Sequence, residues 1–517
     1  MMSSWGNLPY GNLDYCTWNG VECNNYTGHV TGLVLSGVLY NRLDGCLESQ
    51  VISSSLGELK HLTSLDLSYN NFHGMVIPNF IGTLINLREL TLSESYFGGK
   101  IPSDLGNLTR LTSLDLRMND GLYVESLNWL SQLTLLKQVN LDGTDLSKAK
   151  NWSQVVGSLC MLEVLKMDGC LLSSPVPSSS SLQSPNLNTI SLSRNGFTSS
   201  SVFQWLFNTS HSAKVLRSSL NHLDLSSNFL RGPIPNTIEN LEFLEYLDLS
   251  HNSLSLSGTL HDTFGQLEFL KYLYLSRNLV SGTLPSRLGN FEAPWYLDLS
   301  RNSLSGTIPY TIGDAIYLAH LSLSHNSLSG TIPYTITNMK ALVYLDLSYN
   351  ALKGSINFTI QNLDSLSFLD LSHNSLSGTI PSTIENLYSL TYLDLSYNSL
   401  SGPLPDSIWD LMSLTHLDFS HNPLTTVHHI TEDVEVKDKG DHKVNIGLYV
   451  SIGIGIYTGF WGFWGTLAMK DNWRLSYFKF LDHIIDKLFV KVALYSLHSN
   501  QLYYIQYCTN IKKTLKY

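Results

Sequence analysis

The cysteines are the residues of this chain whose chemistry is easiest to assign. Cys16 and Cys23 are the candidates for a disulfide, because they close a short loop. Cys46, Cys160 and Cys170 are expected to pack as small buried apolar groups. No Cys or His pair at ligand spacing has a matching second pair, so the sequence predicts neither a metal site nor a bound cofactor.

Five Asn-x-Ser/Thr sequons offer a second kind of chemistry, the attachment of N-linked glycans in a secreted chain. They begin at Asn25, Asn107, Asn151, Asn208 and Asn357. None of them lies in the strand positions of the repeats described below, so glycans would leave the face formed by those strands uncovered. This distribution favours an extracellular glycoprotein with one bare binding face.

No motif indicates enzymatic chemistry. Residues 470–517 lack the glycine-rich loop, the strand lysine, the His-Arg-Asp and the Asp-Phe-Gly motifs of protein kinases. The net charge of -11 comes from 31 basic and 42 acidic residues, and no basic stripe runs through the repeats. We therefore expect neither an enzyme nor a nucleic-acid-binding protein.

Internal repeats dominate the chain. The pattern Leu-x-x-Leu-x-Leu-x-x-Asn recurs fifteen times between Leu62 and Asn422, and residues 30–35 add a degenerate copy. The last six spacings are 24 residues each. Such a motif at a period of roughly 20 to 29 residues is the signature of leucine-rich repeats. Repeat arrays grow by stacking, which explains how 517 residues can fold without one very large core.

Each repeat predicts one short strand. In the repeat that ends at Asn350, Leu345 and Leu347 point inward, so Asp346 and Ser348 should face outward. The strands of about 16 repeats would stack in parallel into a concave sheet, on the order of 70 Å along its inner arc. The closing asparagine is expected to bond the backbone of the turn that follows.

Two departures from the repeat are noteworthy. Cys170 takes the place of the closing asparagine, which is the motif's recognised alternative and indicates a structural cysteine. The spacing of 33 residues between Asn195 and Asn228 predicts a longer loop around Trp205. We interpret this segment as a repeat variant, because a separate domain would need more residues.

Outward strand positions that differ between repeats are candidates for contact with a specific ligand. The C-terminal repeats are nearly uniform, with Tyr344 and Phe368 beside Asp346 and Asp370, which is better explained as scaffold. The N-terminal half is varied. Its ligand-binding candidates are Arg88, Glu89, Glu94, Arg117, Met118, Lys137, Lys166, Asp168 and Arg194. An ordinary solvated surface is the alternative interpretation.

A membrane span is predicted at residues 446–469, where 24 consecutive positions carry no charge. As a helix this segment would be about 36 Å long, enough to cross a hydrocarbon core of about 30 Å. Acidic residues precede it and Lys470, Arg474 and Lys479 follow it, so the N-terminal side is expected outside the cell. Gly455 and Gly459 form a GxxxG motif that would let a partner helix approach closely.

A further motif, Leu-Ser-Gly-Thr-Ile-Pro, follows the strand of many repeats, as at 304–309 and 376–381. With this Gly-x-Ile-Pro element the chain resembles the plant leucine-rich-repeat receptor-like proteins, of the fungal-elicitor and pathogen-resistance type. The resemblance covers residues 30–424. The loop from Cys16 to Cys23, with Trp18 and Gly20 inside it, is similar to the paired-cysteine N-terminal cap of that family.

The resemblance implies an α/β-type solenoid, the plant-specific leucine-rich-repeat horseshoe or superhelix, followed by one transmembrane helix. The expected domains are a partial cysteine-pair cap (1–29), the repeat solenoid (30–424), an acidic juxtamembrane segment (425–445), the transmembrane helix (446–469) and a cytoplasmic tail (470–517). In that family the acidic segment and the GxxxG motif dock a membrane-spanning receptor kinase, so Gly455 and Gly459 are the expected contact.

The expected function is that of a single-pass plasma-membrane receptor in plant defence. It would bind an extracellular peptide, protein or glycan ligand and signal through a leucine-rich-repeat receptor kinase. A receptor for a developmental peptide and a secreted-type inhibitor module are alternatives. A truncated, non-functional copy is a further alternative, since residues 1–6 show no signal peptide and no second cysteine pair follows Asn422.

Overall fold

The computed structural model describes residues 14–37, 51–119, 121–175, 182, 184–199, 201–207, 219–256, 264, 267–285, 295–356 and 363–425. All of them belong to one compact unit, Met1–His428, and the second unit, His429–Tyr517, lies outside the described residues. The predicted span at 446–469, with Gly455 and Gly459, therefore lies outside them too, as do Asn208, Asn357 and Cys46. Within the described ranges, no helix is long and apolar enough to cross a bilayer.

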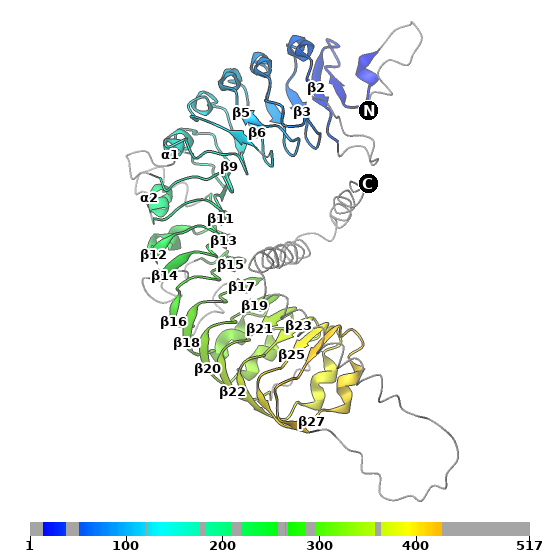
Figure 1. Cartoon of the computed structure of the whole chain (residues 1–517), viewed down its shortest axis with the longest axis vertical. Coiled ribbons are helices and arrows are strands. Elements are labelled where there is room, and N and C mark those ends of the chain that lie inside the picture. Colours follow the sequence, from blue (N-terminus) through cyan, green and yellow to red (C-terminus); the bar gives the residue numbers. More distant parts are fainter. Residues whose placement is uncertain are drawn as a thin grey trace, which may run out of the picture. The chain divides into compact units, whose positions relative to one another are not determined.

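A 17-stranded sheet runs through the repeat unit and lines the inner side of its curve (Figure 1). From β2 onward each strand pairs in parallel with the strand of the next repeat. In sheet order the strands are β1 (Val21–Cys23), β2 (Val30–Val34), β3 (Ser64–Asp66), β4 (Glu89–Thr91), β6 (Ser113–Asp115), β8 (Gln138–Asn140), β9 (Val164–Lys166), β10 (Thr189–Ser191), β11 (His222–Asp224), β13 (Tyr246–Asp248), β15 (Tyr272–Tyr274), β17 (Tyr296–Asp298), β19 (His320–Ser322), β21 (Tyr344–Asp346), β23 (Phe368–Asp370), β25 (Tyr392–Asp394) and β28 (His416–Asp418).

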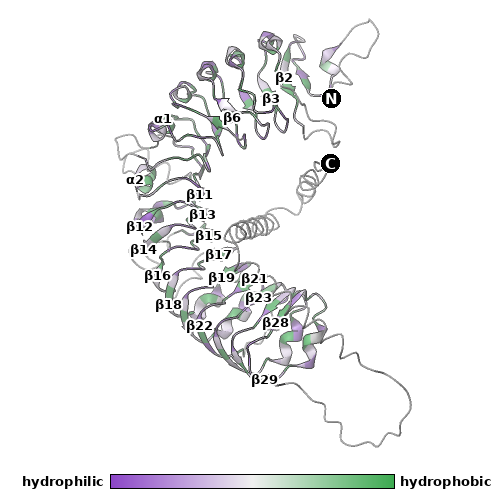
Figure 2. Cartoon of the chain, viewed as in Figure 1, coloured by the Kyte–Doolittle hydropathy of each residue, from purple (hydrophilic) through white to green (hydrophobic). Residues whose placement is uncertain are grey.

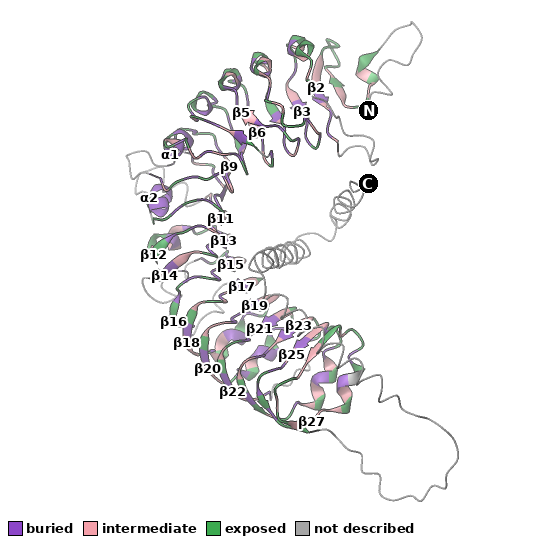
Figure 3. Cartoon of the chain, viewed as in Figure 1, coloured by how far each residue is buried: buried purple, intermediate pink, exposed green. Residues whose placement is uncertain are grey.

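Leucine side chains form a continuous core behind this sheet. Leu342, Leu345 and Leu347 are all 0% exposed, and the same positions of the neighbouring repeats are buried as well. Hydrophobic and hydrophilic segments alternate within each repeat (Figure 2), and buried segments recur along the whole array (Figure 3). Each repeat therefore buries its leucines only by stacking on its neighbours. The expected leucine-rich-repeat solenoid is confirmed.

The closing asparagine joins adjacent repeats. The Asn350 Nδ2 group donates to the carbonyl oxygens of Leu323, Leu347 and Ser348 at 3.0, 3.2 and 3.1 Å. Its Oδ1 atom accepts from the backbone N–H of Leu328 at 2.9 Å. These partners lie in the strand end before Asn350 and in the previous repeat, whereas the sequence suggested the turn that follows. The buried carbonyl groups at the strand ends need a donor there.

Cys170 and Cys160 have different environments. The Cys170 thiol is buried and its Sγ atom lies 3.1 Å from the carbonyl oxygen of Leu141, where an asparagine would place its amide. The structural role predicted for Cys170 thus agrees with its contacts. Cys160 was expected to be buried and is exposed instead. It follows the buried Leu159 in a turn, so its side chain points to the opposite, solvent side.

The Gly-x-Ile-Pro segments build a second layer on the flank of the array. Six parallel strands form its largest sheet: β16 (Ser281–Thr283), β18 (Ser303–Thr307), β20 (Ser327–Gly330), β22 (Ala351–Ser355), β24 (Ser375–Gly378) and β26 (Ser399–Leu400). Smaller pairs are β5 (Gly99–Lys100) with β7 (Leu122–Tyr123), β12 (Arg231–Ile234) with β14 (Ser253–Leu256), and β27 (Gly402–Pro403) with β29 (Leu424–Thr425). Short 3-10 helices such as Tyr334–Asn338 follow the proline of the motif.

An N-terminal hairpin covers the first parallel strand. A disulfide joins Cys16 and Cys23, and β1 pairs antiparallel with β2. Gly20 has a φ of 81°, and a Cβ atom there would collide with the carbonyl oxygen of Val34. The hairpin thereby occupies the edge of β2, which would otherwise be open to pairing with another chain.

The long spacing after Asn195 contains a helix in place of the simple loop that the sequence suggested. Two α-helices are described, α1 (Trp152–Gly157) and α2 (Ser201–Phe207). Trp205 of α2 is buried and its Nε1 group donates to the carbonyl oxygen of Ser153 at 3.2 Å. Strands β10 and β11 still pair in register, so the sheet continues past this segment. The interpretation as a repeat variant is consistent with this continuity.

Candidate ligand-binding face

Neighbouring strands pair in register, so residues at the same position of successive repeats lie side by side across the inner sheet. We call such a row of equivalent residues a column. On β6, β8 and β9, for example, Asp115 pairs with Asn140 and Asn140 pairs with Lys166. Every repeat contributes one residue to each column. A residue that departs from its column is therefore displayed at a defined place on the face.

The column two residues beyond the strand end is serine in nearly every repeat. Its members are Ser68, Ser93, Ser193, Ser226, Ser250, Ser276, Ser300, Ser324, Ser348, Ser372, Ser396 and Ser420. Most of these serines are buried; Ser348, which was expected to face outward, is only 3% exposed. Its small side chain folds back and donates to Asp346 Oδ1 at 2.7 Å.

Three consecutive repeats break this serine column with charged side chains. Arg117, Asp142 and Asp168 follow β6, β8 and β9, which are neighbours in the sheet. All three side chains are partly buried, and burying a guanidinium or carboxylate carries a desolvation cost that a serine hydroxyl does not. We call Arg117, Asp142 and Asp168 the charged triplet.

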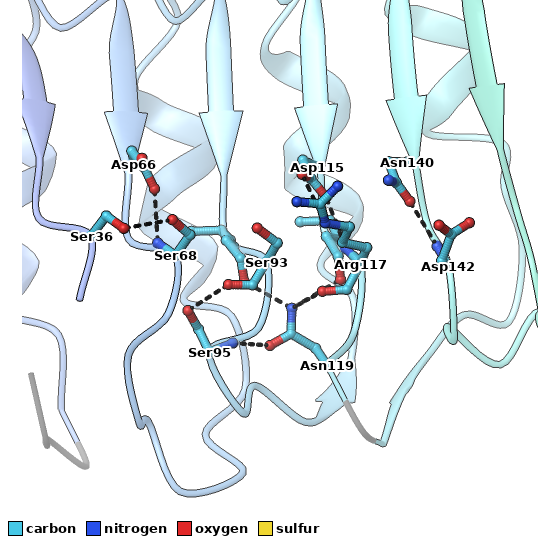
Figure 4. Close-up of polar contacts among 12 residues, drawn as sticks. Ser36, Asp66, Ser68, Ser93, Ser95, Asp115, Arg117, Asn119, Asn140 and Asp142 are labelled. Atoms are coloured by element: carbon cyan, nitrogen blue, oxygen red, sulfur yellow. Dashed lines mark hydrogen bonds and ion pairs between the residues drawn. The ribbon is translucent and has the colours of Figure 1, made fainter. Parts of the chain in front are cut away.

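Arg117 lies within a small charge network. Its Nε atom is 3.6 Å from Oδ2 of Asp115, the last residue of β6 (Figure 4). Burial of the Arg117 guanidinium lowers its pKa. The charge of Asp115, the Tyr69 hydroxyl and the charge of Glu94 outweigh this effect, so the pKa of Arg117 is raised. Burial also raises the pKa of Asp115 in spite of the opposing charge of Arg117. The network unites two of the predicted residues, Glu94 and Arg117.

The two carboxylates of the charged triplet are held by the backbone. The backbone N–H of Asp168 donates to Asp142 Oδ1 at 2.8 Å. Asp168 in turn accepts from Ser191 Oγ at 2.7 and 2.8 Å and from the Ser193 N–H at 2.7 Å. Burial raises the pKa of Asp142 to about 6, and the charge of Lys166 opposes that rise. The triplet thus presents one positive group followed by two negative groups across these strands.

The other ligand-binding candidates predicted from the sequence lie on five neighbouring strands or immediately beside them. These strands are β4, β6, β8, β9 and β10. Two of them have local partners: Glu89 Oε2 accepts from Ser64 Oγ at 3.1 Å, and Lys137 Nζ forms an ion pair with Glu163 at 2.7 Å. Such exposed pairs contribute little to stability or binding. Arg88, Met118 and Arg194 are exposed and point away from the core, with Met118 63% exposed.

Comparisons with known families address what this architecture is. Leucine-rich-repeat family models match residues 316–376 and 371–424, and further single repeats match 61–84, 86–108, 219–241, 243–267, 269–291 and 295–315. Among curated proteins, Receptor-like protein EIX1 of Solanum lycopersicum is 37% identical over 264 residues, which is 48% of this chain and 24% of that protein. Receptor-like protein 6 of Arabidopsis thaliana is 32% identical over 254 residues, or 46% of this chain and 23% of that protein.

The chain is a leucine-rich-repeat protein related to the plant receptor-like proteins. The matched part spans about a quarter of the length of these relatives. The same repeat architecture appears in solved receptor structures. The plant peptide hormone receptor RGFR1 in complex with RGF2 has a TM-score of 0.60 and 29% identity, covering 79% of this chain and 72% of that chain. The Arabidopsis receptor kinase HAESA in complex with the peptide hormone IDA and the co-receptor SERK1 has a TM-score of 0.59 and 26% identity, covering 82% and 83%.

The C-terminal half of this leucine-rich-repeat protein differs from its N-terminal half. His320, Tyr344, Phe368, Tyr392 and His416 stack along the array with ring centroids 4.0 to 4.3 Å apart. Because each ring face is covered by the next ring, the faces are not available to a ligand. The ladder supports the scaffold interpretation.

The three described sequons lie away from the inner strands. Asn25 is in the turn after β1, Asn107 ends the 3-10 helix Ser103–Asn107, and Asn151 immediately precedes α1. Asn25 and Asn107 are exposed, and Asn151 Nδ2 donates to Asn128 Oδ1 at 2.8 Å. Glycans at these positions would leave the inner face open.

Sequence reasoning missed three residues of this face: Tyr69, Asp115 and Asp142. Asp142 could have been found, because it interrupts a serine column that is visible in the sequence once the repeats are aligned. Asp115 matches the aspartate of many other repeats and carries no signal of its own. Tyr69 becomes part of the site only because the next two repeats supply Glu94 and Arg117 beside it.

Proposed function

We propose that this protein is a cell-surface receptor-like protein that binds an extracellular peptide or protein on the charged triplet of the inner face. The replacement of serine by Arg117, Asp142 and Asp168 in three adjacent repeats is the observation that carries the proposal. An array needs only the small serine to stack, so the charged side chains add nothing that the other repeats require.

The chemistry of the triplet suits a peptide backbone and its side chains. Carboxylates accept hydrogen bonds from N–H groups and the Arg117 guanidinium donates to carbonyls or carboxylates. Lys166 adds a cation at the end of β9, and Met118 adds an exposed, adaptable apolar contact. A mixed pattern of charges favours a ligand with a defined sequence over a uniform polyanion.

The relatives support the receptor class. The curated relatives are named receptor-like proteins, and the two solved neighbours described above are plant receptors in complex with peptide hormones. Three sequons placed off the inner face are consistent with an extracellular array. A single-pass location in the plasma membrane is part of the proposal and rests on the apolar sequence 446–469.

A displayed peptide library tests ligand binding on the full-length protein in detergent. Peptides enriched by the wild type are then measured against the triple variant R117S/D142S/D168S, which restores the serine found in the other repeats. We expect the affinity to fall by at least about tenfold, because several charge-assisted bonds are lost. Unchanged affinity would locate the ligand elsewhere and remove the basis of the proposal.

Lys353→Ser is the matched control. Lys353 is exposed on β22 of the flank sheet, where the neighbouring repeats have Ser329 and Ser377. This variant also replaces a charge by the serine of the array, but on another face. It should leave the affinity of the enriched peptides unchanged.

Signalling through a partner leucine-rich-repeat receptor kinase is the second part of the proposal. The receptor kinase HAESA, a solved neighbour, was captured with the co-receptor SERK1, which is consistent with such an arrangement. Co-precipitation of a receptor kinase from plant membranes should be lost in G455L/G459L and retained in a leucine variant at Gly453, which lies off that spacing.

A role in defence is proposed from the resemblance to the elicitor-type receptor-like proteins. A developmental peptide receptor is the second candidate, favoured by the peptide-hormone receptors among the solved neighbours. The two are separated by the source of the peptide that the wild type binds. A microbial sequence supports defence, and a sequence encoded by the plant supports development.

A further inference from the structure

A second departure from the repeat pattern lies in the middle of the array, on β15 and β17. Most strands from β11 onward end in an aspartate, but β15 ends in Tyr274 and β19 ends in Ser322. The column therefore reads Asp248, Tyr274, Asp298, Ser322 and Asp346 along paired strands. Two of these five positions have no carboxylate, so this part of the column is less negative than the part over β21, β23, β25 and β28, which all end in aspartate.

Two arginines stand at this same place. Arg277 and Arg301 each lie three residues after the strand end, with φ values of 54° and 52°. The backbone N–H of Arg277 donates to the carbonyl oxygen of Ser300 at 3.0 Å, and that of Arg301 to Ser324 at 2.8 Å. These bonds hold the two residues in successive repeats side by side. Other repeats place His325 or Tyr349 at this position.

The two guanidinium groups form no ion pair with any residue that the structure describes. Among the described residues, neither Arg277 nor Arg301 has a carboxylate within salt-bridge distance, whereas Arg117 has Asp115. Burial and the charge of Arg301 lower the pKa of Arg277, and Asp298 only partly opposes this. The pair is thus two exposed like charges held close together, and an anion would relieve their repulsion.

An exposed indole lies at the opposite end of β17 from Arg301. Trp295, immediately before β17, is 49% exposed and meets Tyr272 edge-on at a centroid distance of 6.1 Å. The next repeats have Ala319 and Val343 at this position, so the tryptophan is not needed for stacking. Tyrosine, tryptophan and arginine are the residue types that dominate binding energy at protein interfaces.

We propose that Tyr274, Arg277, Trp295 and Arg301, which we call the arginine patch, bind an acidic segment of a protein partner that also presents an apolar side chain. Each guanidinium offers two parallel donors to a carboxylate. The net charge of -11 disfavours the approach of an acidic segment to most of the molecule, and the two adjacent arginines offset that repulsion locally. Two cations are too few for the phosphate contacts of a nucleic acid, and the exposed indole favours a protein over an acidic polysaccharide.

The arginine patch goes beyond the proposed function and rests on it only in taking the inner face as the binding face. It lies several repeats from the charged triplet, since β10, β11 and β13 separate β9 from β15 in the sheet. The two surfaces can therefore be tested separately.

The test uses the full-length protein and a short fluorescein-labelled peptide rich in glutamate with a central leucine. Fluorescence anisotropy should show binding that weakens as salt is added. The variant R277Q/R301Q should bind at least about tenfold more weakly, because both charge-assisted contacts are lost. Arg231→Gln removes an exposed arginine on β12 and should bind as the wild type does.

Two further measurements separate the partner classes. Trp295→Ala should weaken binding of the leucine-containing peptide but leave unchanged the binding of a counterpart with glycine in place of leucine. An oligogalacturonide that binds more tightly than the peptide would overturn the choice of a protein partner. Equal binding by R277Q/R301Q and the wild type, or an equal loss in R231Q, would overturn the patch itself.

The triplet variant R117S/D142S/D168S keeps the two proposals apart. It should bind the acidic peptide like the wild type while losing the library peptides. Loss of the acidic peptide in this variant would contradict a separate arginine patch. Retention of the library peptides in the same variant would contradict the proposed function and leave the arginine patch standing.

Discussion

The Cγ2 methyl group of Thr307 closes the space beside Gly330 in the next repeat. A Cβ atom on Gly330 would lie 2.7 Å from that methyl carbon, and Gly330 has a φ of 79°. The same relationship joins Thr283 to Gly306 and Thr379 to Gly402. The threonine and glycine of the Gly-Thr-Ile-Pro motif thus interlock successive repeats along the flank sheet.

Gly330→Ala should destabilise the array by about 2 kcal/mol, through both the left-handed backbone and the methyl contact. Gly74→Ala is the control, since Gly74 has a φ of 77° and a Cβ atom added there would have nothing within 4 Å. Urea unfolding of both variants separates the two causes. Equal losses in G330A and G74A would mean that the Thr307 contact contributes nothing.

Asn350→Ala should cost about 2 to 3 kcal/mol of unfolding free energy, because it leaves buried carbonyl groups without a donor. Asn350→Cys should cost less, since Cys170 already bonds a carbonyl oxygen from the equivalent place. Thermal unfolding of the two variants gives the order of stability. The interpretation of Cys170 as a working substitute fails if N350C is as unstable as N350A.

The aspartate column should make the protein more stable at mildly acidic pH. Burial raises the pKa of Asp370 from 3.8 to about 6, and the charges of Asp346 and Asp394 add to the rise. A folded-state pKa above the unfolded value means that this stability is present at low pH and is lost as the pH rises through about 6. The melting temperature should therefore increase between pH 8 and pH 5.5.

Asp370→Asn should reduce this pH dependence, because the amide oxygen can still accept from the Ser372 N–H while no charge forms. Asp364→Asn, at an exposed position of the same repeat, is the control and should leave the slope as in the wild type. If both variants keep the wild-type slope, another group is responsible.

His320 should act in the opposite direction at lower pH. Its ring stacks between Tyr296 and Tyr344 at 3.8 and 4.0 Å, and burial lowers its pKa from 6.5 to about 3. The stability that depends on the neutral His320 ring is present above pH 6.5 and is lost as the pH falls toward the pKa of His320 in the folded protein. Acid unfolding followed by circular dichroism should therefore shift to lower pH in His320→Phe, which keeps an aromatic ring in the stack.

His320→Ala provides the comparison for the ladder. It also removes the titrating group but opens a gap between two rings, so it should be less stable than H320F at every pH, by about 1 to 2 kcal/mol. Identical acid midpoints for the wild type and H320F would exclude His320 as the cause of acid unfolding.

Much of the fold could be read from spacing alone. Leu345 and Leu347 are two residues apart, and in a strand that spacing places both on one face. An asparagine recurs at the position of Asn350 in most repeats. Because a buried polar side chain needs hydrogen-bond partners, each of these asparagines requires the same set of partners. The structure differed where the neighbouring repeat decides the environment. Ser348 is buried because Asp346 accepts its hydroxyl, and the segment around Trp205 is helical because its ring packs on Trp152.

The candidate site was only partly predictable for the same reason. Arg117 and Asp168 stand out in the sequence, but their significance depends on β6, β8 and β9 being neighbours in register with Asp142 between them. The arginine patch was missed, because Arg277 and Arg301 are 24 residues apart and look unremarkable until Tyr274 is seen to replace an aspartate beside them. The linear sequence shows how often a position recurs, but it does not show which charged side chains become neighbours in the folded array.

The sequence by itself determined the repeat, the inward leucines and the closing asparagines, because a short periodic motif constrains its own backbone locally. Tertiary structure alone decided which side chains share a surface. Residues from successive repeats become neighbours only through the register of parallel strands, and charge, burial and hydrogen bonding at each position then depend on residues about 24 places away. The methyl group of Thr307 beside Gly330 and the adjacent guanidinium groups of Arg277 and Arg301 are both products of that register.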